Sequence, residues 1–156
     1  MEKSFLRMIR QYGAAIVLMH MRGTPRTMQR HLRYKNVVSE ILDSLKNSIE
    51  NCLEIGIKSD KIIVDPGIGF AKTAEHNLEI IKHLRQFTVL KRPLLIGVSR
   101  KSFIGKVLEK DVSRRLPGSL AAACVSILNG AHIIRAHDVG PTREAAMMTD
   151  TILQGR

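Results

Sequence analysis

Residues 62–72 read "IIVDPGIGFAK", an apolar run followed by an acidic residue, a proline, two glycines, a phenylalanine and a lysine. A short apolar run bounded by turn residues is typical of a strand buried on both faces of a parallel sheet. Asp65 stands where this strand would end, and the glycines suit an abrupt turn toward the next helix. Asp and Gly are also ordinary capping residues, so the segment alone fits a structural turn as well as a ligand site.

Apolar runs alternate with helical patterns along the rest of the chain. Strands are predicted at residues 14–19, 61–64, 93–98 and 132–135. Helices are predicted at residues 4–12, between the strands, and from Thr142 through Leu153, with Gly56 ending one helix and Thr73 capping another. This order predicts a parallel α/β sheet with helices outside, in one domain over residues 1–156. Four β/α units are half of a (β/α)₈ barrel, although an open four-stranded sheet fits the same pattern.

Composition is that of a globular protein with a basic surplus. Of 156 residues, 44% are hydrophobic and 25% charged, and 25 Lys and Arg against 14 Asp and Glu give a net charge of +11. The surplus favours an anionic partner, either a phosphorylated small molecule or nucleic acid. Aromatic residues are only 4% of the chain, which leaves few platforms for stacked bases. Isolated Cys52 and Cys124 predict buried thiols in a cytoplasmic protein, and no apolar stretch approaches a membrane span.

Polar residues follow each predicted strand: His20, Asp65, Ser99 and His137. Ligands of parallel α/β proteins bind at the carboxyl ends of strands, so these four positions are candidates for one site. A carboxylate such as Asp65 accepts two hydrogen bonds from a guanidine-like ligand edge. Residues 99–102, "SRKS", form a cationic cluster at the start of a helical turn, which suits an anion as well as it suits a solvated turn.

Two residues near the last strand share a face. Arg135 and His137 are two positions apart, so both project to the same side of an extended strand and would together hold a phosphate. We expect Asp138, on the other side, to cap a helix or form a salt bridge, and Lys72 to point to solvent. Met19 would line a pocket wall or the core. The sequence lacks a Walker loop, a zinc spacing and a G-x-S-x-G elbow.

With these pieces in order, the chain resembles the dihydropteroate synthase family. The resemblance is carried by "LMHMRGTPRTMQ" (18–29), "DPGIGFAKTAEHN" (65–77), "GVSRKSFIG" (97–105) and "IIRAHDV" (133–139), in the family's order and at its spacings. It implies the second half of a TIM (β/α)₈ barrel. It also implies a transferase of folate biosynthesis, which condenses p-aminobenzoate with 6-hydroxymethyl-7,8-dihydropterin diphosphate and releases pyrophosphate.

The resemblance assigns roles to particular residues. The implied pterin-binding residues are Met19, Asp65, Gly69, Phe70, Gly97, Lys101 and Arg135. Ser102 would bind the p-aminobenzoate carboxylate, and Arg135 and His137 the diphosphate. Lys101, Arg135 and His137 are the implied catalytic residues. The family uses Mg²⁺ on the diphosphate, and its protein ligand belongs to the first half of the barrel, so no metal ligand is expected here.

That first half is absent from the resemblance, and this has consequences. We expect the chain alone to be a fragment that binds pterin weakly and turns over little. The implied partners are the two small-molecule substrates, with no membrane and no specific nucleic acid. A homodimer is implied for the full-length family, and exposed sheet edges favour self-association here. Two alternatives stay open: a pterin-binding methyltransferase domain, and a non-catalytic basic module that binds nucleic acid.

Overall fold

The structure, a computed structural model, describes residues 3–23 and 32–155. Its strands are β1 (Ile16–Met19), β2 (Ile62–Asp65), β3 (Leu95–Ile96) and β4 (Ile133–Ile134). Its α-helices are α1 (Lys3–Tyr12), α2 (Val37–Ile55), α3 (Ala74–Lys82), α4 (Ser102–Leu108), α5 (Leu116–Leu128) and α6 (Val139–Gln154). Short 3₁₀ helices are η2 (Ser59–Lys61), η3 (Leu84–Leu90) and η4 (Val112–Arg114). Each of the four strands overlaps its predicted range: β1, β3 and β4 are shorter than predicted, and β2 ends one residue later and includes Asp65.

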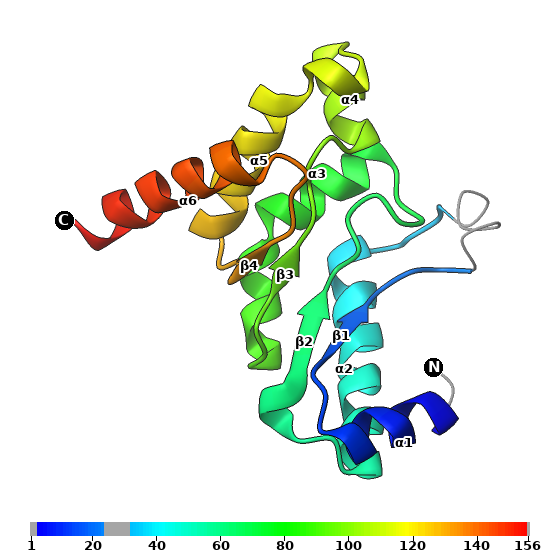
Figure 1. Cartoon of the computed structure of the whole chain (residues 1–156). Helices are drawn as coiled ribbons and strands as arrows, with labels where there is room; N and C mark the ends of the chain where they lie inside the picture. Colours follow the sequence, from blue (N-terminus) through cyan, green and yellow to red (C-terminus); the bar gives the residue numbers. More distant parts are fainter. Residues whose placement is uncertain (1–2, 24–31, 156) are drawn as a thin grey trace.

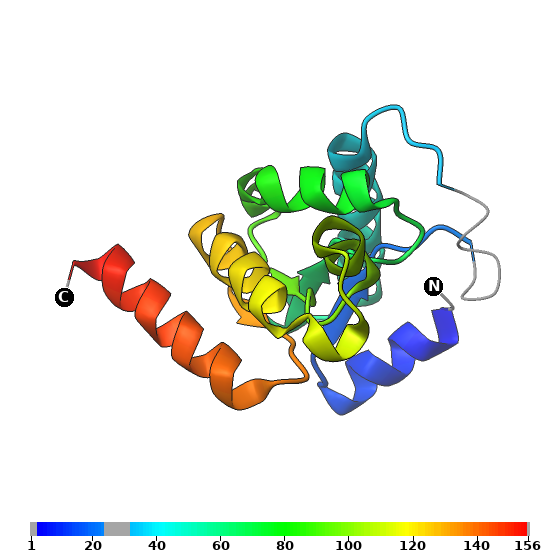
Figure 2. The ribbon, with the colours of Figure 1, turned by 90° about the horizontal axis from the view of Figure 1, so that it is seen from above.

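All strand pairings are parallel. β1 pairs with β2 from Ile16 opposite Ile62 to Met19 opposite Asp65, and β3 pairs with β4. A parallel bridge between Val64 and Leu94 links the two pairs, so the strands follow one another in chain order. Figure 1 shows the four strands side by side, and in Figure 2 helices α2, α3 and α5 curve around one side of them. The predicted parallel α/β architecture is confirmed.

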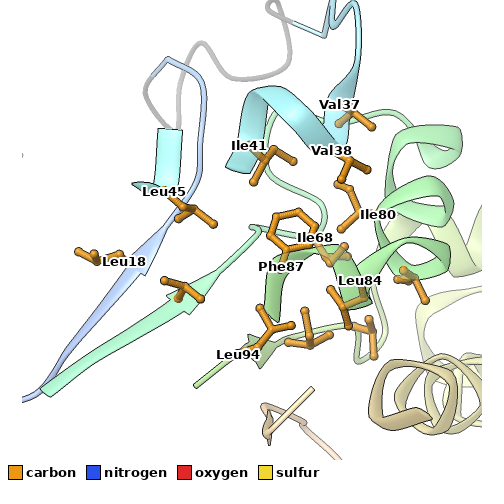
Figure 3. Close-up of a cluster of buried hydrophobic side chains, with 14 of the residues drawn as sticks. Leu18, Val37, Val38, Ile41, Leu45, Ile68, Ile80, Leu84, Phe87 and Leu94 are labelled. Carbon is orange, nitrogen blue, oxygen red and sulfur yellow. The ribbon is translucent and has the colours of Figure 1, made fainter. Parts of the chain in front are cut away.

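The core lies between these helices and the strands. Val38, Ile41 and Leu45 recur at helical spacing on α2, so one face of this helix packs toward the strands. Phe87 of η3 is fully buried among them, with Leu84 beside it (Figure 3). Burial of these side chains fixes the sheet and therefore fixes where each strand ends.

Helix boundaries follow local chemistry. The Thr73 hydroxyl accepts a hydrogen bond from the His76 amide at 3.2 Å, while the His76 ring nitrogen accepts one from the Thr73 amide at 3.3 Å. This reciprocal cap confirms that Thr73 begins α3. Gly56, with φ of +92°, ends α2 as predicted.

The last helix begins earlier than predicted. α6 starts at Val139 rather than at Thr142, and it includes Pro141. A proline in the first turn of a helix removes only an amide that would lack an intrahelical partner anyway, so the helix tolerates it. The same tolerance places Pro117 in the first turn of α5, which begins at Leu116.

The thiol prediction is confirmed for one cysteine only. Cys52 is fully buried on α2, whereas Cys124 is partly exposed on α5, so its prediction as a buried thiol is wrong. The Cys124 thiol lies 3.9 Å from the Ala145 carbonyl oxygen of α6, a helix that extends away from the strands (Figure 2). Within residues 3–23 and 32–155, no helix combines the length and apolar character that a membrane span requires.

Candidate functional site

The site is built at the carboxyl edge of the sheet. Parallel strands bring their carboxyl ends to one edge, which is the upper side of the strands in Figure 1, where α4 also lies. Each of the last three strands contributes a polar side chain from the loop that follows it or from its final residue. The contacts between these side chains decide whether they form one site.

Asp65, at the end of β2, is almost fully buried. Its Oδ1 accepts a hydrogen bond from the Gly67 amide at 2.7 Å, and its Oδ2 lies 4.0 Å from Nη2 of Arg135. Burial raises the pKa of Asp65, while the Gly67 amide and the nearby cations Arg135 and Lys101 partly oppose that rise. A carboxylate has about four acceptor positions, so Asp65 retains capacity for N–H donors of a ligand.

Two glycines shape the turn after β2. Gly67 has φ of +73°, and a Cβ atom on it would lie only 2.0 Å from the carbonyl oxygen of His20. Gly69 has φ of +81°, and its amide donates a hydrogen bond to Oδ1 of Asn77 at 2.7 Å. Asn77 is buried on α3 and also donates to the Thr73 carbonyl. Glycine is therefore needed here because the loop crosses close to the end of β1.

Gly67→Ala is expected to lower the free energy of unfolding by roughly 2 kcal/mol or more, because it combines a left-handed backbone with a backbone clash. Chemical denaturation with circular dichroism measures this change. Gly140→Ala is the matched control, since no atom lies within 4 Å of a Cβ placed there and φ is not positive. The control should be neutral or slightly stabilising. Equal effects of the two substitutions would contradict the described turn.

Lys101 reaches across to the same turn. Its Nζ donates a hydrogen bond to the Ile68 carbonyl at 2.8 Å and lies 4.2 Å from the centre of the Phe70 ring. Burial lowers the pKa of Lys101, the Arg135 cation lowers it further, and Asp65 opposes both. The loops after β2 and β3 are thus joined by an ammonium that contacts an aromatic face and a carbonyl oxygen.

A cavity of about 390 Å³ opens beside Lys101. The described side chains and backbone that line it are those of Gly97, Ser99, Lys101, Arg135, Ala136 and His137. Ser99 Oγ accepts a hydrogen bond from the His137 amide at 3.2 Å and lies 3.0 Å from Nδ1 of the same residue. Arg135 and His137 therefore face one cavity, as their spacing predicts.

A second ion pair fixes the frame of this cavity. Arg100 donates two hydrogen bonds to the Asp138 carboxylate, at 2.9 and 2.6 Å, which confirms the salt bridge expected for Asp138. The Arg100 guanidinium lowers the pKa of Asp138. Because Arg100 precedes Lys101 and Asp138 follows His137, this pair ties together the two loops that carry the cavity cations.

Other predicted residues lie at the margin. Met19 is half-buried and pairs with Asp65 in the register of β1 and β2, so the two side chains share a face of the sheet. Ser102 is exposed at the first residue of α4, beside the cavity rather than in its described lining. Residues 24–29 of the first family-like motif lie outside the described residues.

The prediction that Lys72 points to solvent is wrong. Lys72 is buried, and its Nζ lies 3.1 Å from Nδ1 of His20 and 2.9 Å from the Phe70 carbonyl oxygen. The close crossing at Gly67 brings the polar end of β1 within reach of this lysine. No local sequence signal marks the contact, because it depends on two loops that are far apart in the chain. The contact of Asn77 with the Gly69 amide likewise has no local sequence signal, because it depends on how α3 meets the loop after β2.

Comparison with known proteins adds independent findings. A family model described as "Pterin binding enzyme" matches residues 1–137. Dihydropteroate synthase of Escherichia coli K12 is 40% identical over 155 residues, which are 99% of this chain and 55% of the relative. The crystal structure of Yersinia pestis dihydropteroate synthase with a sulfonamide drug complex superposes with a TM-score of 0.95 at 35% identity, covering 99% of this chain and 57% of that one.

A third match carries a named ligand. The dihydropteroate synthase of Thermus thermophilus, solved in complex with 4-aminobenzoate, superposes with a TM-score of 0.92 at 34% identity and covers 97% of this chain and 62% of that chain. The chain thus spans about half the length of the curated relatives it matches. These superpositions confirm parallel β/α units that form half of a (β/α)₈ barrel.

Proposed function

The chain belongs to the pterin-binding enzyme family, and we propose that it supplies the pterin- and diphosphate-binding part of a dihydropteroate synthase. In the proposed reaction, the amine of p-aminobenzoate attacks the methylene carbon of 6-hydroxymethyl-7,8-dihydropterin diphosphate. The observation that carries the proposal is the convergence of three strand ends. Asp65 lies 4.0 Å from Arg135, and Arg135 shares a cavity with Lys101 and His137.

The pterin ring would bind against Asp65. A pterin presents an amino group and a ring N–H side by side, and a carboxylate matches this pair of donors with two hydrogen bonds. Asp65 is poorly satisfied within the protein, since Arg135 is too distant for a hydrogen bond. Lys101, held over the Phe70 ring, would donate to the pterin carbonyl and ring nitrogen. Gly69, Phe70, Gly97 and Met19 would line the slot for the flat ring.

The diphosphate would bind to Arg135 and His137. As the carbon–oxygen bond breaks, its electron pair moves to the departing phosphate oxygen, and positive charge develops on the pterin methylene. Fixed cations around the leaving group and the carboxylate under the pterin stabilise both changes. Carbon–nitrogen bond formation then releases one proton from the amine to solvent. This chemistry needs no nucleophile from the protein, and the site accordingly consists of charges and hydrogen-bond donors.

Ser102 would bind the carboxylate of p-aminobenzoate. It is exposed at the first residue of α4, directly after Lys101, so its hydroxyl is open to an anion.

Mg²⁺ does not fit the described residues of this chain as a bound ion. Within the described ranges, no group of three His, Cys, Asp or Glu side chains converges. Asp65 is the acidic residue of the site; it is already hydrogen-bonded to Gly67, and the cations near it are Arg135, Lys101 and Lys72. Three cations near one carboxylate oppose a further cation. Among the described residues, Arg135 and His137 are therefore the groups assigned to the diphosphate.

A product assay tests the proposal. Dihydropteroate formation from both substrates would be followed by chromatography, with this chain alone and with the complementary half of the Escherichia coli relative added. We expect little turnover by the chain alone and measurable turnover by the mixture. Lys101→Met should remove that turnover, whereas Lys46→Met, on the exposed face of α2, should leave it unchanged. Failure of the mixture together with failure to bind pterin would contradict the proposal.

A further inference from the structure

Lys72 is the one buried lysine of the described chain, at 5% exposure, and the proposed chemistry does not use it. Its Nζ contacts three acceptors: Nδ1 of His20 at 3.1 Å, the carbonyl oxygen of His20 at 3.4 Å and the carbonyl oxygen of Phe70 at 2.9 Å. None of these is a carboxylate. A buried ammonium without a direct anionic partner is costly, so its retention calls for a specific reason.

These contacts join two segments that are far apart in the chain, since His20 and Lys72 are separated by 52 residues. One is the end of β1, and the other is the loop after β2 that contains Gly67, Gly69 and Phe70. The loop approaches β1 so closely that a Cβ on Gly67 would meet the His20 carbonyl at 2.0 Å and Nζ of Lys72 at 3.4 Å. Lys72 is thus buried at the point where the loop after β2 packs against the end of β1.

The clamped loop carries the groups proposed to hold pterin. The amide of Gly67 donates to Asp65, and the ring of Phe70 lies under Lys101. We infer that Lys72 is a positioning residue, which fixes this loop against the end of β1 so that Asp65 and Phe70 are prearranged for the pterin ring. The inference rests on the proposed function, because it gives Lys72 a role in that same site.

The contacts that Lys72 can make depend on whether its side chain is protonated. An ammonium has three N–H donors for its three acceptors, and the neutral amine has two. If Lys72 loses a proton, its two remaining N–H groups can still donate to both carbonyl oxygens. The hydrogen bond to Nδ1 of His20 is then lost, or Nδ1 becomes the donor and the amine the acceptor. Burial lowers the pKa of Lys72 to about 7 and that of His20 to about 4, so His20 is the neutral acceptor at physiological pH.

Other charged groups face this lysine from every neighbouring loop. Asp65 at the end of β2 raises the pKa of Lys72, whereas Lys101 after β3 and Arg22 after β1 lower it. Loss of the Lys72 proton removes a positive charge near Asp65 and weakens the contacts that hold the loop after β2 against the end of β1. Affinity for pterin should then fall as pH rises through about 7, even for a pterin that carries no phosphate.

The experiment compares Lys72→Met with the wild-type chain, using 6-hydroxymethylpterin as the probe. Titration calorimetry should show an affinity lowered about tenfold, as expected when a binding loop loses its alignment. Lys46→Met, an exposed lysine on α2, is the matched control and should bind as the wild type does. Unchanged affinity of Lys72→Met would overturn the inference. Absence of binding by the wild type would instead contradict the proposed function.

A second measurement does not depend on the stability of the variant. In wild-type chain with ¹⁵N-labelled histidine, the ring nitrogens of His20 should shift with a midpoint near the Lys72 pKa of about 7, and pterin affinity should fall with the same midpoint. A lysine that only stabilises the fold would still shift the His20 nitrogens as it titrates, but it would leave the pterin affinity unchanged across that transition. A pterin affinity that stays constant as pH rises through about 7 would overturn the inference.

Discussion

Asp65→Asn is expected to weaken binding of 6-hydroxymethylpterin by at least about 100-fold. A carboxylate accepts both N–H donors of the pterin edge, whereas asparagine offers one acceptor and presents a donor against the second N–H. Hydrogen bonds to charged groups contribute about 1.5–3 kcal/mol each, and about 1.4 kcal/mol corresponds to a factor of ten. Titration calorimetry on the wild type and the variant measures the loss.

Stability separates this binding effect from misfolding. Burial raises the pKa of Asp65, so its contribution to folding is lost as pH rises through that raised value, and above it the ionised carboxylate opposes folding. Asparagine keeps the shape and can still accept from the Gly67 amide. The variant should therefore be at least as stable as the wild type above the raised pKa of Asp65, although it binds pterin poorly.

Asp60→Asn provides the matched control. Asp60 is exposed in η2, just before β2, so its substitution removes the same charge away from the proposed site. It should leave affinity unchanged. Equal affinities of Asp65→Asn and the wild type would show that the pterin edge does not bind at Asp65.

Phe87→Ala is expected to lower the free energy of unfolding by about 3–5 kcal/mol. Phe87 has no exposed surface and lies among side chains of α2, β2 and the 65–72 loop, including Ile41 and Ile68 (Figure 3). Removal of the ring loses its burial and leaves a cavity that a close-packed core fills only in part. Small domains are stable by about 5–15 kcal/mol, so this variant should be partly unfolded at moderate temperature.

Val89→Ala controls for the 3₁₀ helix itself. Val89 lies two residues along η3 and is 69% exposed, so its truncation should change stability by less than about 0.5 kcal/mol. Urea denaturation measures both variants. A loss below about 1 kcal/mol for Phe87→Ala would contradict the described packing of α2 against the strands.

Sequence reasoning located the strands and the edge that carries the site. Apolar runs bounded by turn residues are local signals, and parallel strands necessarily bring Asp65, Ser99 and His137 to one edge. The two-residue spacing of Arg135 and His137 predicted a shared face, and both line one cavity, although β4 ends at Ile134 and Ala136 lines that cavity too. Asp138 was expected to form a salt bridge or cap a helix because it projects to the side opposite Arg135 and His137. Its partner Arg100 is set by the packing of two loops and has no local sequence signal.

The errors at the site concern contacts between segments that are distant in the chain. A lysine after a glycine-rich turn is usually solvated, and the burial of Lys72 depends on the exact crossing of the chain at Gly67 and His20. Asn77 lies within a recognisable helix, yet its bond to the Gly69 amide is set by how that helix meets the loop. α6 begins earlier than predicted because Pro141 lies within its first turn, where a proline is tolerated, rather than before the helix.

The central claim is that three strand ends form one pterin site, and backbone amide shifts on addition of the pterin diphosphate test it most directly. If the claim holds, the amides of Gly67, Gly69, Ser99 and His137 shift together with a single dissociation constant. Shifts confined to one of these loops, or to the groove between α1 and α2 lined by Leu6, Arg7 and Asn51, would contradict it.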